Sequence, residues 1–298
     1  MKLLKISFFV ISVICIGLFL NSCSKTIYKS YWQVLPEKHD CAFMLNDSNG
    51  IYPPLSQTLR FFDTKSKLQY AFYNDAKNLY FVFRTTDEQA QVKIIRGGME
   101  LWIDTTGRDR NLTGFSYPLA SDQMNKRIKP PVDKQANGSP SFSPNERKLR
   151  ARKYLISQCN QMLLQGFKSP IGGMSLLKND YGISVCLDII PNSSFNPKDT
   201  TLTLIYEAVI PFSTFYKPLI TVSDTNKRFS INIKINGIQM DGIFPGGPPP
   251  GGPPPMMRGA MPGSLPSGGP FPMRPALMNF SNLGETNLIK FNFKLSYK

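Results

Sequence analysis

The chain has 298 residues, enough to bury a full core in one large domain or in two smaller ones. Its 35 lysines and arginines against 20 acidic residues give a formal net charge of +15. This charge fits a solvated surface, an anionic membrane, lipopolysaccharide or an acidic glycan. The single histidine, His39, excludes a zinc or haem centre built on histidines.

Residues 1–22 are predicted to be a signal peptide that ends at a lipidation site. Two lysines precede an apolar run over residues 6–20, and a short polar exit leads to Cys23. The run is about 15 residues, short of the roughly 20 that a membrane-spanning helix needs. The ending resembles the bacterial lipobox, which implies that Cys23 is diacylated and becomes the new N-terminus. Ser24 follows it, which implies a lipid anchor in the outer membrane, on the periplasmic side; an exported protein has no nucleic-acid partner.

After the leader we expect a tether over residues 23–39 and one domain over residues 40–298. The domain carries a helical insertion at 145–167 and a disordered loop at 245–275, in which proline and glycine make up 20 of 31 residues. Proline lacks a ladder donor and glycine is costly to order, so this loop is read as exposed. Its four methionines are read as part of a flexible or partner-binding loop, because neither histidine nor cysteine lies beside them for copper.

Three cysteines belong to the domain: Cys41, Cys159 and Cys186. An oxidising compartment allows one disulfide and one spare thiol among them. The sequence does not indicate which of them pair.

Alternation of apolar and polar residues predicts a series of strands. Residues 74–77 should close one hairpin, and the last two strands should be the arms of another, each with one face in water. The pattern predicts an all-β fold, an antiparallel β-sandwich. The expected strands are residues 41–45, 68–73, 78–86, 99–104, 115–119, 183–190, 202–211, 229–238 and 287–297.

One amphipathic helix is expected, at residues 145–167. Leu149, Ile156, Cys159 and Leu163 recur on one face, and basic residues crowd into the first turns of the other. One interpretation places this helix on the membrane surface. The favoured one packs it across an end or edge of the sandwich, because the basic residues do not follow the whole polar face.

No sequence motif for catalysis or for a cofactor occurs. Asp104, Asp109 and Asn111 are candidate calcium ligands, but the spacing and two neighbouring arginines favour a solvated hairpin loop. We therefore expect no metal, no cofactor and no enzymatic activity. The carboxylates in or near strands, which form no acid–base signature, are Glu88, Glu100, Glu207, Asp104 and Asp188.

Three strand motifs stand out: NLYFVFRTTD at 78–87, ELWID at 100–104 and YEAVIPFS at 206–213. Together they resemble the family 9 carbohydrate-binding modules and the wider DOMON-like β-sandwich group. The resemblance implies a β-sandwich that binds a sugar without catalysis, clamped between two tryptophans. Here Trp102 is expected in the core and Trp32 in the tether, so no clamp residue carries over. Other candidates for a stacking face, each equally suited to the core, are Tyr80, Tyr117, Tyr206 and Tyr216.

We therefore expect a lipid-anchored binding protein with glycan as its ligand and no assigned ligand-binding residues. The alternative is a structural or protein-interaction lipoprotein of the envelope that keeps the fold without a sugar site. An open cleft with two parallel aromatic rings would favour the first, and a filled sandwich without such a cleft would favour the second.

Overall fold

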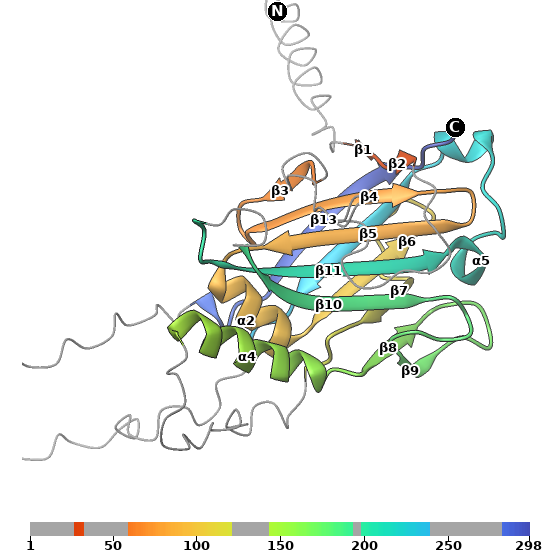
Figure 1. The fold of residues 1–298 in the computed structure, drawn as a ribbon. Helices are drawn as coiled ribbons and strands as arrows, with labels where there is room; N and C mark the ends of the chain where they lie inside the picture. Colours follow the sequence, from red (N-terminus) through yellow and green to blue (C-terminus); the bar gives the residue numbers. More distant parts are fainter. Residues whose placement is uncertain (1–26, 33–58, 121–142, 193–197, 239–281) are drawn as a thin grey trace, which may run out of the picture.

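The computed structural model describes residues 27–32, 59–120, 143–192, 198–238 and 282–298. The signal peptide, Cys23, Cys41, the strand predicted at 41–45 and the loop at 245–275 lie outside these ranges. The described residues are mostly β-strand, in two facing sheets with short helices around them (Figure 1). This arrangement confirms the all-β, sandwich-like class.

The first sheet has seven strands. Side chains alternate between its faces, so Leu101 and Ile103 of one strand oppose Ile233 and Ile231 of the next on the inner face. Across the sheet the strands are β1 (Ile27–Lys29), β13 (Asn287–Lys294), β12 (Phe229–Ile235), β6 (Met99–Asp104), β7 (Thr113–Ser116), β8 (Gln161–Gln165) and β9 (Gly173–Leu176).

The second sheet has six strands. The predicted hairpin joins β4 to β5, with Asn74 opposite Leu79. The strands in order are β10 (Ser184–Pro191), β11 (Leu202–Pro211), β5 (Asn78–Thr85), β4 (Leu68–Asn74) and β2 (Tyr31–Trp32), while β3 (Phe61–Asp63) also pairs with β4.

The main core lies between the two sheets and is rich in aromatic rings. Phe72 stacks on Phe81 with ring centroids 4.7 Å apart, and Phe83 stacks on Tyr206 at 4.8 Å. Burial of each such side chain contributes roughly 1.5–3 kcal/mol. The other face of β5 is also buried, in a smaller cluster around Val82, which confirms that this central strand is apolar on both faces.

The predicted tether contains part of the fold. β1 pairs with β13 and β2 pairs with β4, both in parallel, so residues 27–32 pass from one sheet to the other. The sheets are therefore mixed, because these two pairs are parallel while the remaining pairs between described strands are antiparallel.

The predicted long helix is shorter than expected. α4 spans Pro144–Ser157 and begins with a capping box between Ser143 and Glu146. Residues 161–165 form β8 instead, because Met162 and Leu164 alternate into the core. Leu163 matched the helical spacing, but the period of two decides the structure.

α4 packs beside β10 and the helix α2 (Glu88–Gly97), which the sequence analysis missed (Figure 1). Its half-buried Leu149, Leu155 and Ile156 contact the main core. Its basic residues meet acidic groups of the domain: Lys148 pairs with Glu88 at 2.8 Å, and other pairs join Arg152 to Glu88 and Lys153 to Asp188. These contacts favour the edge-packed interpretation.

The other described helical segments are α5 (Phe212–Phe215) and the 3-10 turn η3 (Val222–Asn226). Within the described ranges, no helix is both long and apolar enough to cross a membrane. The outer face of β12 differs from the prediction of a strand half in water. Ser230 and Asn232 are buried, because the loop after β6 folds over them and Ser230 accepts a hydrogen bond from the Asp109 amide at 3.0 Å.

Candidate binding site

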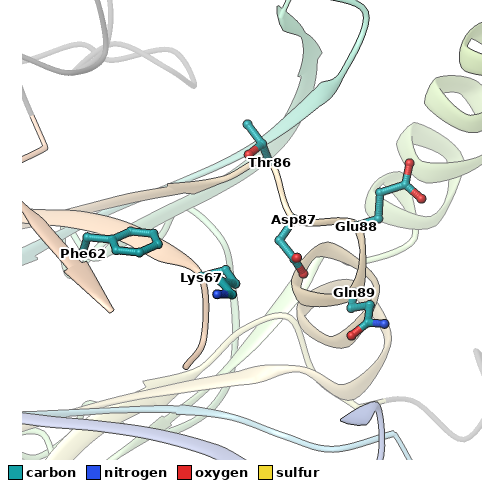
Figure 2. Close-up of a pocket in the computed structure, with 6 residues that line it drawn as sticks. All are labelled: Phe62, Lys67, Thr86, Asp87, Glu88 and Gln89. Carbon is teal, nitrogen blue, oxygen red and sulfur yellow. The ribbon is translucent and has the colours of Figure 1, made fainter. Parts of the chain in front are cut away.

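A cleft of about 630 Å³ opens between the β3–β4 turn and the start of α2 (Figure 2). The ring of Phe62 forms one wall and the first turn of α2 forms the other, with Lys67 between them. The remaining lining residues are Thr86, Asp87, Glu88 and Gln89.

Phe62 is exposed because its strand has one inward and one outward aromatic residue. Phe61 packs inward, with its ring centroid 4.4 Å from Tyr28 and 5.6 Å from Tyr70. Successive side chains point to opposite faces of a strand, so the Phe62 ring is turned outward and is 58% exposed. An aromatic ring held by a paired strand is a preformed stacking surface.

The polar wall is held by helix capping. Asp87 is the N-cap of α2, and its carboxylate accepts a hydrogen bond from the Ala90 amide at 2.8 Å. Thr85 links the two walls: its hydroxyl donates to the carbonyl oxygen of Lys67 at 2.9 Å and accepts from the Asp87 amide at 3.1 Å. Lys67 itself has a φ of 57°, in the left-handed region that tight turns use.

The cleft presents opposite charges and neutral polar groups together. A hydrogen bond from Lys148 lowers the pKa of Glu88, so this carboxylate is ionised at neutral pH. Lys67 supplies an ammonium donor and Gln89 an amide that both donates and accepts. The cleft can therefore hold a molecule that has one apolar face and several hydroxyl groups.

Trp102 is not a core residue, contrary to the prediction. It lies half-buried on the outer face of the seven-stranded sheet, opposite Asn232 and Gly114, while Leu101 and Ile103 face the core. Its indole N–H donates to Glu100 at 2.9 Å. Glu100 and Asp104 lie on the same side of the ELWID strand as Trp102 and mark that side as polar.

The candidate calcium ligands do not converge on a vacant site. Burial alone would raise the pKa of Asp104, but hydrogen bonds from Thr106, Arg108 and Arg110 lower it. Asp109 lies 3.4 Å from Lys290, and Asn111 contacts Asn232 at 2.7 Å. These oxygens serve to fold the loop. Among the described residues, no three His, Cys, Asp or Glu side chains form a group that could hold a metal ion.

The tyrosines do not form a stacking face. Tyr80, Tyr117 and Tyr206 are fully buried, and Tyr216 packs edge-on against Phe229 at 5.4 Å. Trp32 contacts Tyr297 at 5.2 Å, edge to face. Within the described ranges no exposed pair of parallel rings occurs, so the two-tryptophan clamp of the resembling family is not reproduced there.

The carboxylates noted in the sequence are spread over the domain. Glu100 pairs with Lys234 at 2.7 Å on the outer face of one sheet, and Asp188 lies 3.8 Å from Lys153 on the edge of the other. Glu207 is buried in the central strand β11. These side chains lie in different parts of the domain. Of the five carboxylates noted in the sequence, only Glu88 lines the cleft.

The cysteines of the domain include one in a disulfide and one free thiol, as the sequence allowed. Cys186 is disulfide-bonded and Cys159 is a free, buried thiol, so the second half-cystine lies outside the described residues. Burial raises the pKa of Cys159 to about 11, which leaves it protonated and unreactive at neutral pH.

Sequence reasoning missed the cleft because it assigned nothing to residues 59–67. A usable signal was present at the other wall. Asp87 precedes Glu88 and an apolar set ending at Gly97-Gly98, which is the pattern of an N-cap, an acidic first turn and a glycine stop.

The fold and the cleft carry the evidence on function, because comparisons with known proteins found no match. No family model matches the chain, and neither a curated protein nor a solved structure matches it.

Proposed function

We propose that this protein is an outer-membrane lipoprotein, anchored through Cys23, that binds a glycan without catalysis in the cleft beside Phe62. The observation that carries the proposal is an exposed aromatic ring facing hydrogen-bonding side chains across an open cleft. A sugar ring offers an apolar face for stacking and hydroxyl groups for polar contacts, and the cleft offers both partners.

Two further features support an exported binding protein. The disulfide at Cys186 is typical of an oxidising compartment such as the periplasm. The cleft brings together no nucleophile and base, since Asp87 caps a helix and Glu88 is paired with Lys148. The family 9 resemblance of the strand motifs agrees with sugar binding. The cleft differs from the parallel ring pair expected of that family, because Phe62 is the one aromatic residue among those that line it, so the proposal rests on a single stacking ring.

The test is a glycan array with the full-length protein and two single variants. Phe62→Ala should weaken glycan binding by about 5- to 150-fold, because the sugar ring loses its stacking partner and stacking on an aromatic side chain is worth about 1–3 kcal/mol. Trp102→Ala is the matched control, an aromatic truncation on another surface, and should bind as the parent does. Loss of binding with Trp102→Ala alone would place the site on the sheet face instead.

The lipid anchor has its own test. Cys23→Ser should release the protein from the membrane fraction, since it removes the sulfur that accepts the diacylglyceryl group. Cys159→Ser is the control and should stay membrane-bound. A Cys23→Ser protein that remains in the membrane and carries lipid label would refute lipidation at this residue.

A second function, protein interaction in the envelope, is favoured by the edge strand β9. Its outer side chains Met174 and Leu176 are 54% and 62% exposed, and an unpaired strand edge is a template for strand addition. If this function holds, Met174→Lys with Leu176→Lys should abolish cross-linking to an envelope protein, whereas Phe62→Ala should not.

A further inference from the structure

The position of Cys23 restricts how an anchored domain can sit on its membrane. Three residues separate Cys23 from β1, which begins at Ile27. Four Cα steps span at most about 14 Å, so the part of the domain around β1 must lie next to the lipid headgroups. This step rests on the proposed lipidation of Cys23.

Three segments meet near that entry point, and we refer to residues 27–32, 217–228 and 294–298 as the anchor-side surface. Lys29 lies opposite Lys294 in the β1–β13 pair, and η3 contacts β13. Figure 1 shows β1, β2, the C-terminus and the short helix beside it along one margin of the molecule.

The anchor-side surface is strongly basic. Its three segments hold six lysine and arginine side chains and one acidic side chain, Asp224. That carboxylate is buried and is held by Lys217 and Lys227. The other four basic residues of the surface are Lys29, Arg228, Lys294 and Lys298. Within the described ranges, none of them forms an ion pair with a carboxylate side chain, so their positive charge is available to a ligand.

Exposed apolar side chains lie among these charges. Leu219 and Val222 flank the start of η3 and are 53% and 65% exposed, and Tyr297 near the C-terminus is also exposed. Apolar residues that stand out among lysines and arginines are the combination by which proteins enter the interface of an anionic bilayer.

The geometry points to an anionic phospholipid surface as the partner of the anchor-side surface, with Leu219 and Val222 entering the headgroup layer. The cleft then faces away from the membrane. β4 runs from the cleft, where Lys67 precedes it, to Asn74, whose side chain bonds the backbone of Ser296. The two surfaces lie at opposite ends of this strand.

The test measures which end of the anchored protein touches lipid. Full-length lipidated protein carrying Val222→Cys is labelled with an environment-sensitive fluorophore and reconstituted into phosphatidylethanolamine–phosphatidylglycerol vesicles containing lipids with a headgroup nitroxide. Leu288→Cys is the matched control, a similarly exposed leucine, 51%, at the opposite end of β13. Unsubstituted protein taken through the same labelling gives the background.

We expect the nitroxide to quench the Val222 label several-fold more than the Leu288 label, with the difference shrinking when phosphatidylcholine replaces phosphatidylglycerol. Equal or reversed quenching would overturn the proposal and leave the surface open to a protein partner. Equal quenching of the Val222 label on phosphatidylglycerol and phosphatidylcholine vesicles would overturn the electrostatic basis of the proposal. Failure of the protein to stay on the vesicles would also overturn the proposal. The Cys23→Ser release assay then shows whether the proposed lipid anchor is absent.

Discussion

Gly114 determines where the indole of Trp102 lies. The two residues are opposite each other on β7 and β6, and a Cβ at Gly114 would lie 2.9 Å from Cε3 of Trp102 and 2.2 Å from the Leu101 carbonyl oxygen. Only a residue without a side chain leaves this space, so the ring covers the glycine and stays partly exposed. Strand alternation turns Trp102 outward, and the glycine opposite leaves room for its indole.

Gly114→Ala should therefore destabilise the domain by about 1–3 kcal/mol, because the added methyl group must displace backbone as well as the indole. Urea unfolding followed by tryptophan fluorescence measures this. Gly284→Ala is the control, since a Cβ there would meet nothing within 4 Å. Equal stability of the two variants would contradict the close approach.

Asp224 should give the domain part of its acid sensitivity. Burial would raise the pKa of this carboxyl, but Lys217, Tyr216 and Thr221 bind it and hold its pKa well below the usual range. A depressed pKa stabilises the folded state above the unfolded value, about 4, and this contribution is lost as pH falls further.

Asp224→Asn should cost about 2–3 kcal/mol at pH 7, because the lysines lose their anionic partner and one acceptor oxygen becomes an NH2 donor that faces other donors. The variant should also lose less stability than the parent between pH 5 and pH 3, values that bracket the unfolded pKa of about 4. Urea unfolding at both pH values checks this against Asp180→Asn, an exposed control. If the free energy of unfolding of the parent and of Asp224→Asn changes equally with pH, Asp224 does not contribute to the acid sensitivity.

At the scale of elements, α2 is fixed by one buried polar residue. Gln91 is fully buried, and its amide donates to the carbonyl oxygens of Thr85 at 2.9 Å and Leu202 at 2.7 Å. Its own oxygen accepts from Arg152 on α4. One side chain therefore joins α2 to the ends of β5 and β11 and to α4, with every polar atom satisfied.

Gln91→Leu should destabilise the domain by about 2–4 kcal/mol, because it leaves two buried carbonyl oxygens and the Arg152 guanidinium without their partner. Thermal unfolding compared with Gln161→Leu, at an exposed position of β8, isolates the burial effect. If both variants unfold at the same temperature, Gln91 does not link these elements.

The strands β5, β6 and β13 were predictable from the sequence as elements because apolar residues recur at every second position or, in β5, fill both faces. Their boundaries differ from the prediction by a few residues at most. α2 was missed because the buried Gln91 and Lys93 interrupt its apolar face. The cleft could not be predicted, since Phe62 and Gln89 come together only through the pairing of β3, β4 and β5.

At the scale of the whole molecule, the two ends of the described chain are joined by Asn74. Its amide donates to the Ser296 carbonyl oxygen at 2.9 Å, and its oxygen accepts from the Ser296 amide at 3.0 Å and the Ser30 hydroxyl at 2.5 Å. Ser30 lies where the chain passes from β1 to β2. A fully buried side chain thus ties both sheets to the N-terminal crossing and to the C-terminal segment.

Asn74→Ala should cost about 2–4 kcal/mol, because several buried backbone and hydroxyl groups lose their partners together. It should also speed proteolysis near residue 30, which limited digestion and mass spectrometry would locate. Asn160→Ala, at an exposed position, is the control. Unchanged proteolysis in Asn74→Ala would show that the crossing is held by other contacts.

The crossing at Ser30 also has a mechanical consequence. Drag on an anchored domain enters the fold at Ile27, and tension there acts first on the hydrogen bonds of β1 with β13 and then on those of β2 with β4. Because these two pairs belong to different sheets, peeling the N-terminus away requires rupture in both layers of the sandwich. A pull at the proposed anchor therefore has to separate β1 from β13 and β2 from β4 before the N-terminal segment leaves the fold.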